Sequence, residues 1–308
     1  IFSLLSHMKQ ADMLLFGGGT LLQDRTSIKS LHYYLFMLNS AKRHGLKVML
    51  YANGLGPLDS PASIKMVRRV LEQADLITLR DEDSVALLRQ IGVKNPNVYC
   101  TADPVFTLSC SADGQSESDF SAQLKDKRCI LVSVRNSPEC PAGFEDMIAA
   151  ACNYASERYG LLPLLIPMQP KKDYPIMKRI YGKLSCPAFL LERNCSVTEI
   201  LHLLQYAELC LGMRLHSLIY SAIVGIPMIG MEYDPKVGSL LKRVQGTSAG
   251  TIPELQAQTL FHCIDTVMES YDEKKKAVVE NTRELVSLAH RNASLAIELY
   301  CKDSTAKE

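Results

Sequence analysis

Residues 13–52 read MLLFGGGTLLQDRTSIKSLHYYLFMLNSAKRHGLKVMLYA, and this stretch decides the fold class of the chain. The apolar run at 13–16 has the composition of a short buried strand and ends in three glycines. Apolar residues at helical spacing follow at 28–44, and a second apolar run at 47–52 predicts another strand. A strand, a helix and a strand in this order are typical of a βαβ unit with parallel strands.

The alternation of strands and helices continues through most of the chain. We expect further strands at 76–79, 97–100, 129–134, 161–166, 189–191, 208–211 and 227–230. We expect helices at 61–73, 81–91, 143–158, 173–184, 196–206 and 215–224, and a helical tail from Pro253 to near Tyr300. The pattern therefore predicts an α/β protein built from parallel sheets.

The chain is long enough for two domains, because it has 308 residues and one domain takes roughly 100–200. The polar stretch SCSADGQSESDFSAQLKDK at 109–127 interrupts the alternation and indicates a linker. We predict an N-terminal Rossmann-like domain at 1–108, a linker at 109–128, and a C-terminal Rossmann-like domain with the helical tail at 129–308. Two doubly wound domains of this kind are expected to face a cleft and to bind ligands beyond the carboxyl ends of their strands.

Composition excludes several classes of protein. The chain has 34 Lys and Arg against 33 Asp and Glu, so a nucleic-acid partner is not expected. No apolar run reaches the ~18 residues of a membrane-spanning helix, and no secretory signal precedes the first strand, which favours the cytoplasm. The 10 cysteines are scattered without metal-binding spacing, which predicts reduced thiols and no bound metal.

The glycine-rich loop of the first domain is a candidate for ligand contact. Gly17, Gly18 and Gly19 follow a strand, where glycine lets backbone N–H groups approach a ligand oxygen. The loop lacks the Gly-Lys-Ser/Thr of a P-loop, so a plain tight turn is the alternative. Asp24, just beyond, has two interpretations: it accepts a hydrogen bond from a sugar hydroxyl, or it caps the next segment.

The richest segment is GMRLHS at 212–217, which leaves a strand and enters a helix. The positive end of that helix favours an anion, and Arg214 has the bidentate geometry to bind one. His216 is a histidine, the side chain whose ordinary pKa lies near neutral pH. A His that serves only a backbone carbonyl is the alternative for His216. Lys236 and Arg135 also follow strands of this domain, although a solvated side chain is the alternative for each. Converging cations favour a small substrate with phosphate and carboxylate groups, opposite a partner that bears hydroxyls, as in a transferase.

These segments resemble the polysaccharide pyruvyl transferases, and most closely the CsaB type, which modifies secondary cell-wall polymers of S-layer bacteria. The matching strings are LLFGGGTLLQDRTS at 14–27, YANGLGP at 51–57, LITLRDEDS at 76–84, ADPVF at 102–106, SVR at 133–135, IPMQPKKD at 166–173, GMRLHSLIYSA at 212–222 and GMEYDPKV at 230–237. They follow the family order through nearly the whole chain.

The resemblance implies a GT-B-like fold, phosphoenolpyruvate as donor substrate, no cofactor, and a lipid-linked saccharide as acceptor. The product would be a pyruvate ketal on an N-acetylmannosamine unit, with release of phosphate, and the lipid implies peripheral association with the inner face of the membrane. By motif, His216 corresponds to the catalytic acid, and Arg214, Lys236 and Arg135 to donor-binding residues. Gly17, Gly18, Gly19 and Asp24 fall on the acceptor side.

The family pattern begins with a strand and an Asp-bearing loop before the position of Ile1, so we expect the first domain to lack its first strand. Two other functions remain open at this point: a GT-B glycosyltransferase that uses a nucleotide-sugar donor, and a non-catalytic binding module. Fold alone does not separate these functions. The sequence makes no prediction of oligomeric state.

Overall fold

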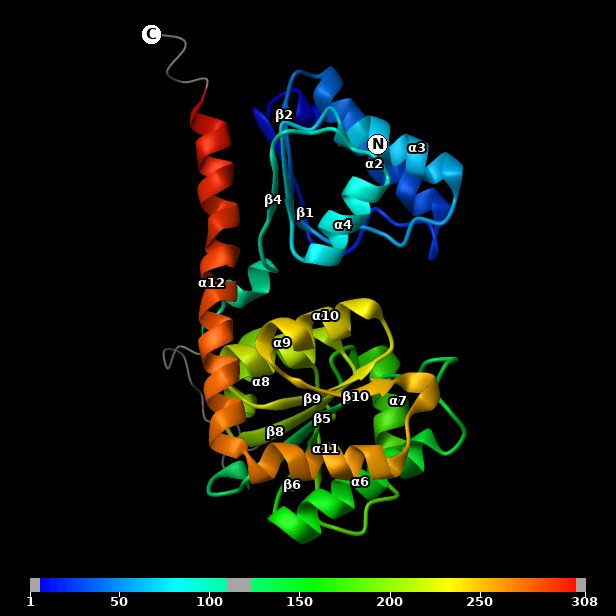
Figure 1. Cartoon of the computed structure of the whole chain (residues 1–308), viewed down its shortest axis with the longest axis vertical. Coiled ribbons are helices and arrows are strands. Elements are labelled where there is room, and N and C mark those ends of the chain that lie inside the picture. The colour runs from blue at the N-terminus through cyan, green and yellow to red at the C-terminus, as the bar shows by residue number, and fades with distance from the viewer. Residues whose placement is uncertain (1–5, 110–122, 303–308) are drawn as a thin grey trace. The chain divides into compact units, whose positions relative to one another are not determined.

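The computed structural model describes residues 6–109 and 123–302. The chain divides into two compact units, each with its own parallel sheet (Figure 1). Unit 1 comprises Ile1–Thr107 and Glu284–Glu308, and unit 2 comprises Leu108–Arg283. The prediction of two parallel-sheet α/β domains is therefore confirmed.

Unit 1 contains a sheet of four parallel strands in the order β1-β2-β3-β4. Its elements are β1 (Met13–Gly17), α2 (Ile28–Arg43), β2 (Lys47–Asn53), α3 (Pro61–Leu71), β3 (Leu76–Leu79), α4 (Glu82–Gln90), β4 (Val98–Cys100) and the short 3-10 helix η1 (Pro104–Thr107). Right-handed crossovers between sequential neighbours place α2, α3 and α4 on the same face of the sheet.

The alternation of side chains along β2 gives this sheet two buried faces. Val48 and Leu50 pack among residues of α2, α3 and α4, whereas Met49 points to the other side. There it meets Leu295 and Ala296 of α12 (Tyr271–Cys301), which covers the second face (Figure 1). The end of the tail thus belongs to unit 1, whereas the sequence pattern had assigned it to the C-terminal domain. The physical reason is that the second face of the sheet needs an apolar cover.

Unit 2 contains six parallel strands in the order β10-β9-β8-β5-β6-β7. Its strands are β5 (Cys129–Ser133), β6 (Leu162–Leu165), β7 (Phe189–Leu190), β8 (Ala207–Gly212), β9 (Met228–Glu232) and β10 (Thr247–Thr251). Its helices are α6 (Phe144–Tyr159), α7 (Pro170–Tyr181), α8 (Val197–Leu204), α9 (Leu215–Val224), α10 (Pro235–Val244), η2 (Ile252–Glu254) and α11 (Ala257–Glu269). The chain builds outward from β5 in one direction, then returns to place β8 on the other side of β5.

Most predicted elements are confirmed within a few residues, and the exceptions have local causes. Helix α10 and strand β10 were not predicted. The sequence of β10, TSAGT, contains a single buried apolar residue, Ala249. The tail was predicted as one helix, whereas the structure breaks it at Ser270 into α11 and α12. The predicted linker at 109–128 falls largely on residues 110–122, outside the described part of the chain. Leu124, near its end, is fully buried.

Candidate active site

Three predicted site segments follow three adjacent strands of unit 2. Arg135 comes two residues after β5, Arg214 two residues after β8, and Lys236 four residues after β9. In an open parallel sheet, ligands bind at the carboxyl edge where the strand order reverses. The order of this sheet places that reversal between β5 and β8, so the fold brings the predicted donor-side residues to its own ligand-binding position.

Arg214 lies in a buried ion pair with Asp173 of α7. The Arg214 Nε donates to the Asp173 carboxylate at 3.0 Å, and Nη2 donates to its other oxygen. The same Nη2 donates to Gln169 Oε1 at 3.3 Å, and the Gln169 backbone N–H donates to Asp173 at 2.8 Å. The bidentate edge of Arg214, which was expected to hold an anionic ligand, therefore holds a carboxylate of the chain itself. The Nη1 group has no hydrogen-bond partner within the described residues and remains for a ligand.

The N-terminus of α9 adds a second feature that favours anions. Arg214 is its N-cap residue, and no side chain caps the helix there. The amide groups of a first helical turn and the helix dipole together attract negative charge. His216 is the second residue of this helix, it is exposed, and its ring centre lies 6.0 Å from that of Tyr220. An exposed imidazole beside an uncapped helix end can meet a substrate that occupies this edge.

Tyr233 connects the other two cations. The Arg135 guanidinium lies over its ring at 5.1 Å from the centre, and the Lys236 ammonium lies 5.9 Å from the same centre. Lys236 also forms an ion pair of 2.9 Å with Asp234, whose carboxylate caps α10 through the Lys236 backbone N–H. Both cations are partly exposed, so they are positioned by an aromatic face without being buried.

Two residues of this site, Asp173 and Tyr233, were not predicted from the sequence. Asp173 precedes Ile176, Met177 and Ile180 by three, four and seven residues, which places it on the apolar face of the helix. That signal was not used, because a carboxylate in the first turn of a helix is also a common exposed pattern. Tyr233 lies between Glu232 and Asp234, in the loop that leads to Lys236. Asp173 is fully buried and pairs with Arg214, which follows β8, and only the tertiary structure shows this pairing.

The glycine-rich loop of unit 1 forms a tight turn at the end of β1. Gly18 and Gly19 have φ values of +86° and +62°, which residues with a Cβ rarely adopt. The Gly19 carbonyl accepts a hydrogen bond of 3.0 Å from the Gly54 N–H, in the loop after β2. A Cβ on Gly54 would lie 2.5 Å from Thr20 Oγ1, so this second glycine allows the two loops to meet. Gly17 ends β1 and faces Tyr51.

Arg80, directly after β3, forms the polar centre of this edge. Its Nη1 donates to Asp103 at 2.6 Å, its Nη2 donates to Thr20 Oγ1 at 3.2 Å, and its Nε lies 3.7 Å from Asp81. The Arg80 and Asp103 side chains are only 8% and 11% exposed, so this pair is buried like the pair in unit 2. Two carboxylates surround one guanidinium here.

Asp24 contacts the backbone at the start of α3. Its two carboxylate oxygens accept hydrogen bonds from the N–H groups of Asp59 and Ser60, both at 3.0 Å. Burial alone raises the pKa of Asp24, but these hydrogen bonds outweigh it and bring the pKa below its ordinary value of 3.8. Of the two interpretations given above, the structure shows the capping contact, although to a helix that begins 37 residues later.

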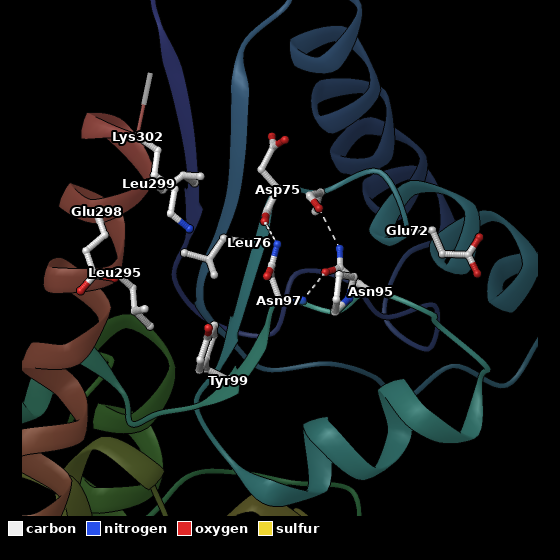
Figure 2. A pocket seen from close by; sticks show the side chains of 12 residues that line it. Glu72, Asp75, Leu76, Asn95, Asn97, Tyr99, Leu295, Glu298, Leu299 and Lys302 are labelled. Atoms are coloured by element: carbon white, nitrogen blue, oxygen red, sulfur yellow. Dashed lines mark hydrogen bonds between the residues drawn. The ribbon is translucent and has the colours of Figure 1, made fainter. Parts of the chain in front are cut away.

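A cavity of about 380 Å³ in unit 1 lies near the start of β3, at the opposite edge of the sheet. Figure 2 shows Asp75, Asn95 and Asn97 on one side of it and side chains of α12 on the other. The side-chain N–H groups of Asn95 and Asn97 donate to backbone carbonyls, and Asp75 accepts from Lys42. These three polar side chains are thus engaged, and the cavity is at the opposite edge from the strand ends where the chemistry is expected.

The cysteines and the other metal-ligating side chains of the described residues add no further site. Nine cysteines lie in the described ranges, and none of the nine forms a disulfide. Burial raises the pKa of Cys129 to about 11 and that of Cys210 to about 12, so these thiols are unreactive. Residues 6–109 and 123–302 contain no group of three or more His, Cys, Asp or Glu side chains that could hold a metal ion. In the same ranges, no helix is long and apolar enough to cross a membrane.

Two units, each with its own parallel sheet and covering helices, define a GT-B-like fold. The model of the family "Polysaccharide pyruvyl transferase" matches residues 2–235, and the chain belongs to this family. The amylovoran biosynthesis protein AmsJ of Erwinia amylovora is 19% identical over 303 residues, covering 88% of this chain and 69% of AmsJ. The resemblance to the family is thereby confirmed.

Solved structures support the fold. The UDP-GlcNAc 2-epimerase of Neisseria meningitidis, bound to UDP-GlcNAc, has a TM-score of 0.65 at 13% identity, covering 96% of this chain and 81% of that one. Anabaena Alr3699/HepE, in complex with UDP and glucose, has a TM-score of 0.58 at 12% identity, with the same coverage of 96% and 81%. At such identities the likeness concerns the fold alone.

Proposed function

We propose that this protein transfers pyruvate from phosphoenolpyruvate to a sugar of a lipid-linked cell-wall polysaccharide, as an enzyme of the CsaB type. The acceptor is N-acetylmannosamine, and the products are a pyruvate ketal and phosphate. Family membership supports polysaccharide pyruvylation in general. The donor, the acceptor sugar and the lipid are parts of the proposal.

One observation carries it: cationic groups and an imidazole follow three adjacent strands at the strand-order reversal of unit 2. Phosphoenolpyruvate has a phosphate and a carboxylate, and this edge offers the uncapped N-terminus of α9, the Nη1 of Arg214, and the partly exposed Arg135 and Lys236. Charge-assisted hydrogen bonds from such groups are the stronger ones in proteins. We assign donor binding to these groups.

The proposed reaction begins with proton transfer from His216 to the methylene carbon of phosphoenolpyruvate, which leaves C2 cationic. One sugar hydroxyl attacks C2, and a second hydroxyl forms the other C–O bond as the C2–O bond to phosphate breaks. Of the two hydroxyl protons, one restores His216 and one leaves with phosphate. A histidine suits this role because its ordinary pKa lies near neutral pH. Arg214, Lys236 and the helix end stabilise the departing phosphate.

The acceptor side is assigned to unit 1, through the loop of Gly17, Gly18 and Gly19 at the end of β1. The left-handed turn at Gly18 and Gly19 leaves open space on the side where a Cβ would stand. Sugar hydroxyls can therefore approach the backbone closely. In this proposal Asp24 is a supporting residue of the loop. Both of its carboxylate oxygens accept hydrogen bonds from the backbone at the start of α3 and so connect the loop to that helix.

The test is phosphate release from phosphoenolpyruvate with a lipid-linked disaccharide that ends in N-acetylmannosamine. We expect His216→Ala to lower the rate at least ~100-fold, the low end of general acid catalysis. His262→Ala is the matched control, since His262 is exposed on α11, away from the strand ends. A loss of less than about threefold in His216→Ala would remove His216 from the role of acid.

A second measurement separates this function from that of a glycosyltransferase with a nucleotide-sugar donor. Thermal unfolding is followed with phosphoenolpyruvate and with a UDP-sugar, because a ligand that binds the folded state raises its melting temperature. We expect phosphoenolpyruvate to raise it and the UDP-sugar to leave it unchanged. Stabilisation by the UDP-sugar alone would contradict the proposal.

A further inference from the structure

All charged side chains of α2 and α3 in unit 1 are basic. The two helices comprise 16 and 11 residues and contain no Asp or Glu. Their basic residues are Lys29, Lys42, Arg43, Lys65, Arg68 and Arg69. In a chain with 34 basic and 33 acidic residues, so uneven a distribution marks a local electrostatic surface.

Four of these cations are exposed and lack an ion pair within the described chain: Lys29, Arg43, Lys65 and Arg69. The other two are neutralised by carboxylates outside the helices. Lys42 pairs with Asp75 at 2.7 Å, and Arg68 lies 4.0 Å from Glu72. The nearby Asp59 is engaged by Arg25. The charge of the surface is therefore not cancelled by its neighbours.

Apolar side chains lie among these cations. Ile28, Tyr33 and Phe36 of α2 are 42%, 46% and 39% exposed, and all three lie on one helix among the basic residues. Lys29, Tyr33 and Phe36 follow one another at intervals of four and three residues, so they share one face of the helix. Cations and aromatic rings thus form one continuous stripe.

A groove of about 580 Å³ separates this stripe from α3. Leu35, Phe36, Met66 and Val70 give it an apolar lining, and Arg43 and Arg69 lie at it from opposite helices. Figure 1 shows α2 and α3 side by side, with α12 on the other face of the sheet. The helix that completes unit 1 therefore leaves this groove uncovered.

We propose that the α2–α3 surface, defined by Lys29, Tyr33, Phe36, Arg43, Lys65 and Arg69, binds the surface of an anionic phospholipid bilayer. Basic residues attract anionic headgroups, with about a fivefold gain in partitioning for each Lys or Arg near the surface. Aromatic and aliphatic groups of an amphipathic helix enter the boundary of the acyl chains. A nucleic acid would use the cations but leave Ile28 and Phe36 without a role.

Binding by this surface does not depend on the proposed reaction. It is measured without phosphoenolpyruvate or saccharide, so the failure of one proposal leaves the other intact. Peripheral membrane association was expected above only because of the lipid-linked acceptor. In this proposal the α2–α3 surface is the part of the chain that contacts the membrane.

The first experiment is co-sedimentation of the full chain with vesicles of phosphatidylcholine, alone or mixed with phosphatidylglycerol. We expect binding to the anionic vesicles only, and release at high salt because the headgroup contacts are ionic. A variant with Lys29→Glu, Arg43→Glu, Lys65→Glu and Arg69→Glu is expected to lose at least ~100-fold in partitioning. The matched control replaces the solvated run Lys274, Lys275 and Lys276 by Glu and keeps the affinity of the original chain.

The second experiment leaves the basic residues of the α2–α3 surface unchanged and measures directly whether this surface inserts into the bilayer. The chain has no tryptophan, so Phe36→Trp places a single fluorescent reporter on the surface, and Tyr181→Trp places one on an exposed site of α7 in unit 2. We expect anionic vesicles to shift the emission of the Phe36→Trp variant to the blue and to leave that of the Tyr181→Trp variant unchanged. Equal binding to neutral vesicles, no binding, or a dimer in sedimentation that the four-Glu variant abolishes would each overturn the proposal.

Discussion

Each unit of this protein has one buried Arg–Asp pair at the carboxyl edge of its sheet, and the two pairs differ in what surrounds them. In unit 1, Arg80 donates to Asp103, and Asp81 lies 3.7 Å from the same guanidinium. In unit 2, Asp173 takes the Nε and Nη2 of Arg214 and leaves Nη1 without a partner in the described chain. One arginine is enclosed by two carboxylates, whereas the other is held by one.

The difference indicates which unit has the capacity to bind an anion. Around Arg80 the carboxylates outnumber the cation, so a second anion would be repelled. Near Arg214 the loops add Arg135 and Lys236, and Asp234 balances only one of them. Glu232 keeps its negative charge, but its carboxylate accepts a hydrogen bond from the Ser248 hydroxyl of β10 and forms no ion pair with these cations in the described residues. A buried ion pair can thus fill a site, as in unit 1, or position a guanidinium for a ligand, as we propose for unit 2.

The largest effect is expected from breaking the pair in unit 2. Asp173→Ala leaves the Arg214 guanidinium buried without its carboxylate, which costs about 3–5 kcal/mol of unfolding free energy. Asp103→Ala is the matched variant in unit 1 and costs less, about 1–3 kcal/mol, because Asp81 and Thr20 remain beside Arg80. Scanning calorimetry of both variants measures the difference. Equal losses would show that the two pairs are alike.

A smaller effect is expected from a variant at the proposed anion-binding edge of unit 2. Lys236→Met removes one proposed phosphate contact and is expected to lower kcat/KM for phosphoenolpyruvate by ~10–100-fold, the range of a hydrogen bond to a charged group. Lys171→Met is the control, since Lys171 is exposed at the start of α7 in the same unit. Steady-state phosphate release gives both values. A loss as large in Lys171→Met would assign the effect to net charge instead of the site.

The smallest effect concerns Asp24 in unit 1 and depends on pH. Because its pKa in the folded state lies below the ordinary 3.8, Asp24 stabilises the fold above that value and loses this contribution as the pH falls through the lower pKa. The side chain is partly exposed, so the contribution is below about 1 kcal/mol. Melting temperatures should therefore show Asp24→Asn less stable than the original chain at neutral pH, and equal to it in strong acid. A difference in melting temperature that persists in strong acid would show that the effect does not come from the charge of Asp24.

From the sequence we could single out the proposed donor-side residues, but not the residues that support them. Arg135, Arg214, His216 and Lys236 were singled out because each closely follows an apolar run, and parallel strands bring such positions to one edge. Asp173 escaped, since a carboxylate in the first turn of a helix is an ordinary surface pattern. Helical spacing places Asp173 on the same face as Ile176, Met177 and Ile180, but its pairing with Arg214 depends on how α7 packs, which local periodicity does not encode.

By itself the sequence determined the parallel α/β class, the strand ends and the family, because hydrophobic periodicity and short motifs act over a few neighbouring residues. The tertiary structure alone decided that the end of α12 completes unit 1, that Asp24 caps α3, and that Asp173 occupies the bidentate edge of Arg214. Each of these depends on which surfaces meet across tens of residues. Burial and ion pairing stabilise these contacts only once the two surfaces pack together.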